Sequence, residues 1–263
     1  MKKVLVSFIA VLMATGIASA FGAREHKAIA IIAENHLTPK AAAAVREITG
    51  GERLAVFASH PDRYRSYFLI DGRKIWHTYH LNAGLKPEET GGNSLFRAIE
   101  MGTGALAGEG YRRIADKDSA QIYLAYIVHF IGDMHCPGHV KYPEGMGNPS
   151  PKKYIVGEKT IDFHKCWDSQ FISEAFNVST MDMVYISDIA SPEEIAEYQK
   201  GGLMDWADDT AHSCYDFTHD GDVQDNGAVK CTPHFVTAHA LFAKHQAMKA
   251  GYRLAAYLNA MFE

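Results

Sequence analysis

Two pairs of histidine and aspartate residues share the same four-residue spacing. His129 and Asp133 form one pair, and His164 and Asp168 form the other. Because four residues of an α-helix turn about 400°, the members of each pair project from one helix face. Histidine nitrogen and carboxylate oxygen are donors that zinc prefers, and a catalytic zinc keeps one position open for water. The spacing therefore predicts metal ligands, with a surface ion pair as the alternative for either pair taken alone.

Other residues of the same chemistry stand upstream and downstream of the first pair. Asp62 and His77 lie 15 residues apart, and His139 follows Asp133 by six residues. Pro137 should end the helix, because the residue before proline avoids the helical region. The chain can then turn and direct His139 back toward the same pocket. We expect His135, which lies between Asp133 and His139 in the sequence, to orient a neighbouring carboxylate or to pack beside this cluster of donors.

The start of the chain predicts a secretory signal. Within residues 1–20, two lysines, an apolar run and an Ala-Ser-Ala cleavage pattern follow one another. Cleavage would free an α-amino group on Phe21, five residues before His26, and an amine and an imidazole at the head of a helix could share one metal ion. We therefore expect an exported protein, periplasmic or secreted, with residues 21–263 as its single zinc-dependent domain.

The composition limits the partners. The whole chain carries a net charge of −5, and the first 20 residues contain two lysines and no acid, so −5 becomes −7 without them. Such a chain has no global attraction for nucleic acid or for an anionic membrane, so local cations must bind any phosphate. Three Zn²⁺ ions would bring −7 to about −1. No later segment reaches the roughly 18 apolar residues of a membrane span, and we expect a monomer.

The cysteine count suggests disulfides. The four cysteines are Cys136, Cys166, Cys214 and Cys231. An even number in an exported chain favours two disulfides, for which three pairings exist. We expect Cys136–Cys166 and Cys214–Cys231, because the first pair lies in two motifs that should meet in space. Four free buried thiols are one alternative, and a cysteine that acts as a soft zinc ligand is another.

The elements that must position these residues are helical throughout. The apolar periodicity predicts helices over residues 25–37, 39–48, 94–107, 119–135, 163–176 and 234–262. Thr38 should cap the second helix, with Pro39 at its first position. The helix over 119–135 is almost entirely apolar, which predicts a central, buried position. Residues 83–93 and 141–160 indicate surface loops. The fold class that follows is all-α, in one compact multi-helix domain.

Taken together, the motifs resemble those of a known family, the zinc-dependent single-strand nucleases and 3′-nucleotidases of the S1/P1 type, which belong with the zinc phospholipases C. The resemblance covers the whole chain after residue 20. Family members begin with an aromatic residue and glycine, and carry Ala-x-x-x-Asp-x-x-Arg, His-Phe-Ile-Gly-Asp, His-x-Pro-x-His and His-x-x-Trp-Asp. The matching positions are Phe21, Gly22, His26, Ala58, Asp62, Arg65, His129–Asp133, His135–His139, His164, Trp167 and Asp168.

The resemblance implies the fold of that family and three zinc ions per chain. It implies that the first ion is held by Asp62, His77, His129 and Asp133. The second would be held by the Phe21 amine and carbonyl, His26 and the bridging Asp133. The third would be held by His139, His164 and Asp168.

The resemblance also implies a reaction. The two zinc ions bridged by Asp133 would generate hydroxide from bound water near neutral pH and would bind the phosphoryl oxygens. Asp62 would orient the attacking water, and Arg65 would pair with a phosphoryl oxygen as charge grows there. The substrates would be single-stranded RNA or DNA, cleaved to leave a 3′-hydroxyl and a 5′-phosphate, and the 3′-phosphates of nucleotides.

The substrate pocket departs from the family pattern. Family members often place an aromatic residue directly after the histidine that matches His77, and an acid two residues further on. Thr78 and His80 occupy those positions here, and Tyr79 could supply the ring with a shifted backbone. The substrate-binding candidates are therefore Arg65, Thr78, Tyr79 and His80.

Two other functions compete with the nuclease. A phospholipase C would use the same metals, but those enzymes have a longer gap before the first histidine and glutamate in the last pair. The five-residue gap to His26 and the presence of Asp168 argue against it. A zinc-storage protein would have closed sites, and Arg65 argues against storage because storage needs no partner for an anion.

Overall fold

The computed structural model describes residues 21–88, 92–221 and 227–263, so the predicted signal over 1–20 lies outside the described residues. The described part is rich in helix. Its α-helices are α1 (Ala23–Asn35), α2 (Pro39–Thr49), α3 (His60–Arg63), α4 (Leu95–Leu106), α5 (Lys117–Met134), α6 (Phe163–Lys165), α7 (Phe171–Phe176), α8 (Thr180–Ser187), α9 (Pro192–Tyr198), α10 (Leu203–His219) and α11 (Pro233–Phe262). Shorter turns are η1 (Leu54–Val56), η2 (Gly110–Arg113), η3 (Pro137–His139) and the π-helical η4 (Cys166–Gln170).

Small sheets join these helices, so the all-α expectation is correct only as a description of the helical core. The sheets consist of β1 (Leu69–Ile70) with β2 (Arg73–Lys74), then β4 (Pro87–Glu88), β3 (Tyr79–Leu81) and β5 (Val140–Lys141), then β7 (Lys159–Asp162), β6 (Lys153–Val156) and β8 (Ala228–Lys230). The strands β4 and β6 fall in segments predicted as loops. Strands β5 and β8 come from distant parts of the chain and pair in parallel with β3 and β6, respectively, which no local pattern reveals.

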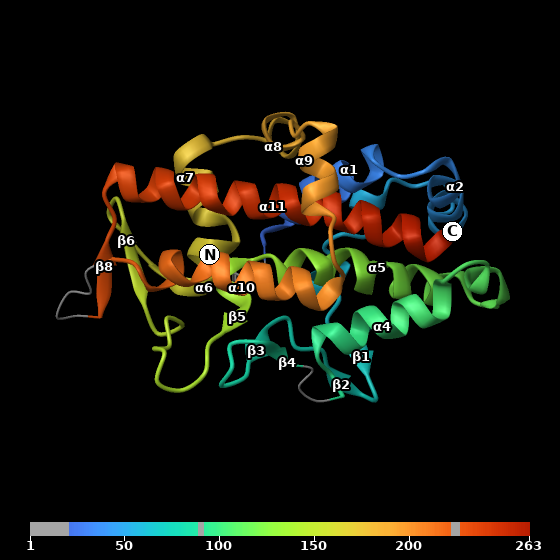
Figure 1. Ribbon diagram of the computed structural model, residues 1–263, viewed down its shortest axis with the longest axis horizontal. Helices are drawn as coiled ribbons and strands as arrows, with labels where there is room; N and C mark the ends of the chain where they lie inside the picture. The colour runs from blue at the N-terminus through green and yellow to red at the C-terminus, as the bar shows by residue number, and fades with distance from the viewer. Residues whose placement is uncertain (1–20, 89–91, 222–226) are drawn as a thin grey trace, which may run out of the picture.

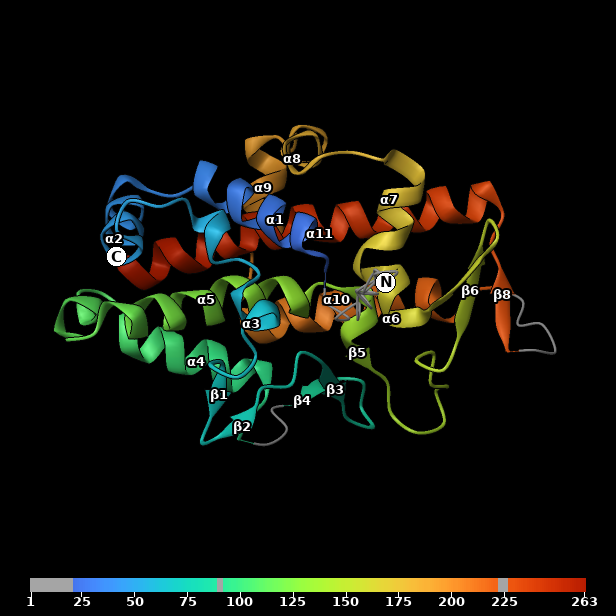
Figure 2. The ribbon, with the colours of Figure 1, turned by 180° about the vertical axis from the view of Figure 1, so that it is seen from behind.

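The long helices lie along one another. Helix α11 follows most of the long axis of the molecule, at about 45 Å for its 30 residues. Helix α5 packs between α11 and α4, and α1 packs on α11 from the side seen in Figure 2. A Cβ added to Gly251 would lie 2.7 Å from the Cβ of Ile32. The absence of a side chain at Gly251 therefore lets the backbones of α1 and α11 approach closely.

Local capping rules explain where the first helices begin and end. The Thr38 side chain accepts a hydrogen bond from the Ala41 N–H, and Gly50 ends α2 in the left-handed conformation at φ 67°. Ser94 caps α4 in the same way. The helix predicted over 163–176 is interrupted by η4, and helices α8 to α10 lie where no helix was predicted. None of the helices among the described residues is both long and apolar enough to cross a membrane.

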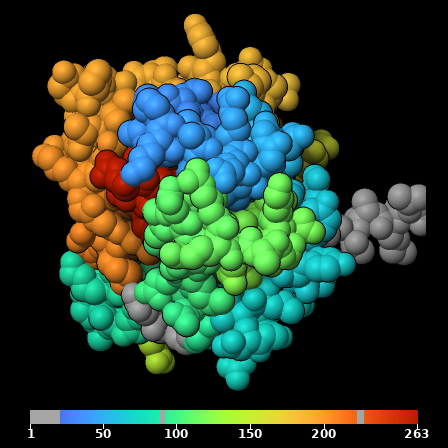
Figure 3. All heavy atoms as spheres, turned by 90° about the vertical axis from the view of Figure 1, so that its right-hand side faces the viewer, coloured from blue at the N-terminus to red at the C-terminus, as the bar shows by residue number. Residues whose placement is uncertain are grey.

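At the end of the molecule that carries the C-terminus, side chains from several helices pack against one another. Side chains of the blue N-terminal helices lie against green residues that follow α4, and red residues of α11 reach the surface beside them (Figure 3). Tyr111 in η2 packs edge-on against Phe262, with ring centroids 5.8 Å apart. The polar donors described below lie away from this end, in the middle of the helical layers.

The four cysteines, all among the described residues, are free thiols, so the predicted disulfides Cys136–Cys166 and Cys214–Cys231 are wrong. The two motifs do meet, but their thiols face different partners. Cys136 Sγ lies 3.7 Å from Asp168 Oδ1. Burial and the neighbouring Cys231 thiol raise the pKa of Cys166. Cys214 is fully buried in α10, against α11.

Candidate metal centre

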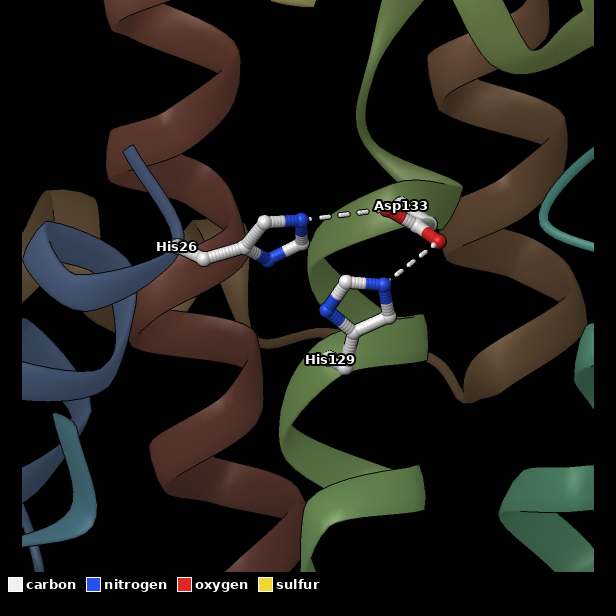
Figure 4. A group of neighbouring side chains, drawn as sticks. All are labelled: His26, His129 and Asp133. Carbon is white, nitrogen blue, oxygen red and sulfur yellow. Dashed lines mark ion pairs between the residues drawn. The ribbon is translucent and has the colours of Figure 1, made fainter. Parts of the chain in front are cut away.

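Four imidazoles surround the carboxylate of Asp133 near the C-terminal end of α5. Its Oδ1 lies 3.2 Å from His26 Nε2 and 3.8 Å from His139 Nδ1. Its Oδ2 lies 2.7 Å from His77 Nδ1 and 3.2 Å from His129 Nε2. Figure 4 shows His26 reaching from the N-terminal segment to one oxygen while His129 reaches the other from α5 itself. Each oxygen of this carboxylate thus faces its own group of nitrogen donors.

A glycine in α5 makes room for the ring of His26. A Cβ added to Gly132 would lie 2.8 Å from His26 Nδ1, closer than a side chain permits. The His26 ring instead stacks on the His129 ring, with centroids 4.1 Å apart and planes at 20°. Steric contact therefore explains the glycine of the His-Phe-Ile-Gly-Asp segment, because only a residue without a side chain lets α1 place His26 against α5.

Asp62 adds a second carboxylate on the side of His77. Its Oδ1 lies 3.7 Å from His77 Nδ1, and its Oδ2 lies 3.7 Å from His129 Nε2. The His129 Nδ1–H donates to the Ala58 carbonyl at 2.8 Å, which leaves Nε2 directed at the carboxylates. Arg65 Nη2 donates to Asp62 Oδ1 at 3.0 Å. The short helix α3 therefore presents an acid and a guanidinium to the same group of donors.

A third group of donors forms where η3 meets η4. The His139 Nδ1–H donates to the His77 carbonyl at 2.6 Å, so its Nε2 is free to face His164 Nε2 at 2.9 Å. Asp168 Oδ1 lies 3.7 Å from His139 Nε2, and Asp168 Oδ2 lies 3.7 Å from His164 Nε2. The predicted four-residue pair thus converges, although α6 and a π-helical turn carry it rather than a regular helix.

Phe21 lies beside these donors. It is fully buried, and its ring stands edge-on to His26 with centroids 6.3 Å apart. The Gly22 N–H donates to the Asp168 carbonyl at 2.7 Å, which ties the start of α1 to η4. Ligation by the Phe21 amine depends on a cleavage within residues that the structure does not describe, and it stays a prediction.

The electrostatics of the cluster follow from burial and crowding. Burial, together with the neighbouring His129, lowers the pKa of His26. Burial also disfavours charge on His129, but Asp133 outweighs it and raises the pKa of His129 to about 9. Burial and the charges of Asp133 and Asp62 raise the pKa of Asp168 well above its usual value. Carboxylates crowded in this way are stabilised by positive charge placed among them.

The donor set fits divalent metal ions. Atoms with no hydrogen-bond partner among the described residues include His26 Nδ1 and Nε2, Asp133 Oδ1 and Asp168 Oδ2. An unsatisfied buried polar group costs about 1–3 kcal/mol, and a bound cation would supply partners for these lone pairs. Within the described part of the chain, three groups have donor atoms close enough to share an ion, namely His26 with His129 and Asp133, Asp62 with His77 and His129, and Cys136 with His139 and Asp168.

Access to the cluster is from one side. The side chains of His26, His129 and Asp133 are fully buried, whereas those of His77 and His164 are 17% and 34% exposed. The Arg65 side chain, which contacts Asp62, is more open, with 43% of it exposed. A ligand that reaches the donors therefore passes between these more exposed residues.

The predicted substrate-binding residues differ in how exposed their side chains are. Strand β3 alternates, so Tyr79 and Leu81 point inward and His80 points outward. The Tyr79 ring is 1% exposed, and its hydroxyl donates to the Ala207 carbonyl at 3.0 Å. Tyr79 is therefore not available to stack on a base, which corrects that prediction, while Thr78 remains partly exposed. Trp76 was not among the predicted substrate-binding residues, although its side chain is exposed and lies near the His80 ring.

Comparison with known proteins agrees with this geometry. A search of curated proteins finds no match. The protein-family model described as S1/P1 nuclease matches residues 21–263, which is nearly the whole chain. The chain therefore belongs to the S1/P1 nuclease family.

Proposed function

We propose that this protein is an exported zinc-dependent phosphoesterase with three metal ions. It would cleave phosphodiester bonds of single-stranded RNA and DNA and remove 3′-phosphates from nucleotides. The observation that carries the proposal is the buried Asp133 carboxylate, whose two oxygens face separate groups of nitrogen donors. Family membership supports the nuclease activity, since S1/P1 nucleases act on phosphodiester bonds.

Each proposed ion has its own donors, and Asp133 serves two of them. The proposed sets are Asp62, His77, His129 and Asp133, then the Phe21 amine and carbonyl with His26 and Asp133, then His139, His164 and Asp168. Bound zinc would lower the pKa of a water molecule and neutralise charge on the phosphoryl oxygens. The hydrogen bonds from His129 to Ala58 and from His139 to His77 support the proposal, because they hold each ring with its Nε2 toward the carboxylates.

The chain's own residues perform the remaining tasks. The Asp62 carboxylate lies closer to the entrance than Asp133 and would accept a hydrogen bond from the attacking water, which orients it. Arg65 donates to Asp62, which holds its guanidinium beside the cluster, where it can bind a phosphoryl oxygen. Because the donors are recessed, a flexible single strand can bring its phosphate to them, whereas a stiff duplex cannot.

Export and processing complete the proposed second site. Removal of residues 1–20 would convert the Phe21 amide nitrogen into a free amine beside His26. A variant whose processed chain begins one residue earlier would displace this amine while keeping every side chain. We expect it to lose about one zinc ion per chain, measured by elemental analysis. Full zinc content and full activity in this variant would exclude the amine as a ligand.

Hydrolysis assays test the proposal directly. Single-stranded oligonucleotides should be cleaved much faster than duplexes of the same sequence, and a chelator should abolish both reactions. Equal cleavage of both forms, or activity that survives chelation, would contradict it. Hydrolysis of phosphatidylcholine without hydrolysis of oligonucleotides would favour a phospholipase C instead.

A further inference from the structure

One cysteine lies among the metal donors. Cys136 is fully buried at the start of η3, between the end of α5 and His139. Its Sγ, one nitrogen of His139 and one oxygen of Asp168 all lie within 4.8 Å of one another. The four cysteines all belong to the described residues, and Cys136 is the one that belongs to such a group.

The spacing of these atoms suits a shared ion. Zinc binds thiolate sulfur at about 2.3 Å and carboxylate oxygen at about 2.0–2.2 Å, so two such ligands of a tetrahedral ion lie about 3.5 Å apart. The distance between Cys136 Sγ and Asp168 Oδ1 is 3.7 Å. The thiol therefore needs little movement to bind the ion that Asp168 binds.

An unpartnered carboxylate oxygen beside Cys136 points to a bound cation at this position. Asp168 is nearly fully buried, and its Oδ2 has no hydrogen-bond partner among the described residues. A thiolate and a carboxylate placed side by side in such a buried site are stable only with a cation between them.

We propose that Cys136 is a fourth protein ligand of the metal ion held by His139, His164 and Asp168. On metal binding the thiol releases its proton to solvent, and the sulfur donates a lone pair to the ion. Two imidazole nitrogens, one carboxylate oxygen and one thiolate are all ligand types that zinc binds, and four of them complete a tetrahedral ion. With Cys136 this site has four protein donors, the same number as each of the two proposed sites that share Asp133. The inference rests on the proposed zinc centre.

Cobalt substitution tests the assignment on the intact protein. Zinc is removed with a chelator under reducing conditions and replaced by Co²⁺, whose visible d–d bands report metal bound to nitrogen and oxygen. A thiolate ligand adds a sulfur-to-cobalt charge-transfer band in the near ultraviolet. We expect this band in the wild type, its loss in Cys136→Ser, and its retention in the matched control Cys214→Ser, which alters an equally buried thiol. Zinc affinity at one site should fall by more than the ~10–100-fold typical of a lost outer-shell partner.

The outcomes separate this inference from the proposed function. Visible bands without the charge-transfer band in the wild type, or a band that persists in Cys136→Ser, would overturn thiolate ligation and leave the zinc centre standing. Failure to bind cobalt at all would refute the metal centre itself. If Cys136→Ser does not fold, replacement of the other three cysteines by serine provides the same test, because the band must then survive.

Discussion

Two buried polar clusters lie at the C-terminal end of α5, separated by two residues of sequence, and they differ in how their atoms are satisfied. Around Asp133, several imidazole and carboxylate atoms lack hydrogen-bond partners among the described residues. Around His135, in contrast, the ring donates from Nδ1 to the Ile131 carbonyl at 2.7 Å and accepts at Nε2 from Arg253 at 3.1 Å. Arg253 in turn donates to Asp209 at 2.7 Å, and Lys249 pairs with the same carboxylate.

The difference gives a criterion that separates a candidate metal-ligand histidine from a structural one. Burial and the nearby Arg253 charge lower the pKa of His135 well below its usual range, so the ring stays neutral and serves as an acceptor. This second cluster, which we call the arginine cluster (His135, Asp209, Lys249 and Arg253), is complete without an ion. We expected His135 either to orient a neighbouring carboxylate or to pack beside the metal donors. Direct contact with a carboxylate is wrong, because its ring nitrogens bind the Ile131 carbonyl and Arg253, and packing beside the donors stays a prediction. Unused lone pairs, rather than the number of histidines, therefore indicate the metal centre.

The largest effect should follow from removing the carboxylate that two sites share. Asp133→Ala should lose about two zinc ions per chain and lower the hydrolysis rate by more than the ~10⁴-fold upper range of a single general base. The reason is that both oxygens of Asp133 lie among nitrogen donors. Elemental analysis and single-stranded DNA hydrolysis measure the two effects. Full zinc content in this variant would mean that the cluster around Asp133 resembles the arginine cluster after all.

Replacing the acid nearest the entrance should separate catalysis from binding. Asp62→Asn keeps the shape of the side chain and removes its charge, so we expect the fold to persist and kcat to fall about 10²–10⁴-fold. Circular dichroism and steady-state kinetics measure this. Arg65→Lys is a matched comparison that keeps the positive charge but loses bidentate contact with phosphate. Wild-type kcat in Asp62→Asn would remove the residue from the proposed mechanism.

Metal removal should lower the stability of the fold through the loss of ions around Asp133. Bound zinc stabilises the folded state in proportion to the logarithm of its concentration, by about 4 kcal/mol at 1,000 times Kd for one site. Chelation should therefore lower Tm strongly in the wild type and much less in Asp133→Ala. Equal decreases in the two proteins, measured by thermal unfolding, would place the stabilising ions elsewhere.

Disrupting the arginine cluster should affect stability without affecting metal. Arg253→Met removes hydrogen bonds to Asp209, to His135 and to the Tyr198 carbonyl. We expect the free energy of unfolding to fall by about 1–3 kcal/mol, since Asp209 is partly exposed and keeps Lys249. Urea unfolding gives this value, and zinc content should be unchanged. Zinc loss in this variant would show that the two clusters act as one.

The smallest effect should come from a satisfied group near the site. Tyr79→Phe removes one buried hydrogen bond to the Ala207 carbonyl, at a cost of about 0.5–1.5 kcal/mol. We expect KM for oligonucleotides to stay at the wild-type value, because the ring does not reach the surface. A raised KM with unchanged stability would restore Tyr79 to the substrate pocket.

Much of the site could be predicted because its rules are local. Histidine and aspartate at a four-residue spacing place donors on one side of a helix, and Thr38 and Gly50 bound a helix through their own backbone preferences. The π-helical η4 still brings His164 near Asp168, so the spacing was informative even where the geometry was not that of a regular α-helix.

The rest depended on contacts between distant segments. Which face of β3 is buried is decided by packing against α10, and this places Tyr79 inside and His80 outside. The orientation of each thiol is decided by how η3, η4 and β8 meet, which is why Cys136 faces Asp168 rather than Cys166.

The amino-acid sequence by itself predicted the candidate donors, their chemistry and the long helices around them, because each follows from residue type and the backbone within a few residues. The tertiary structure alone decided that Asp133 stands between four imidazoles, that His135 is held by Arg253, and that Cys136 lies beside Asp168. Those outcomes depend on how closely helices pack. Gly132 is an example, because a side chain at this position would collide with the His26 ring. Packing distances of this kind arise from side chains far apart in the chain, so no local pattern contains them.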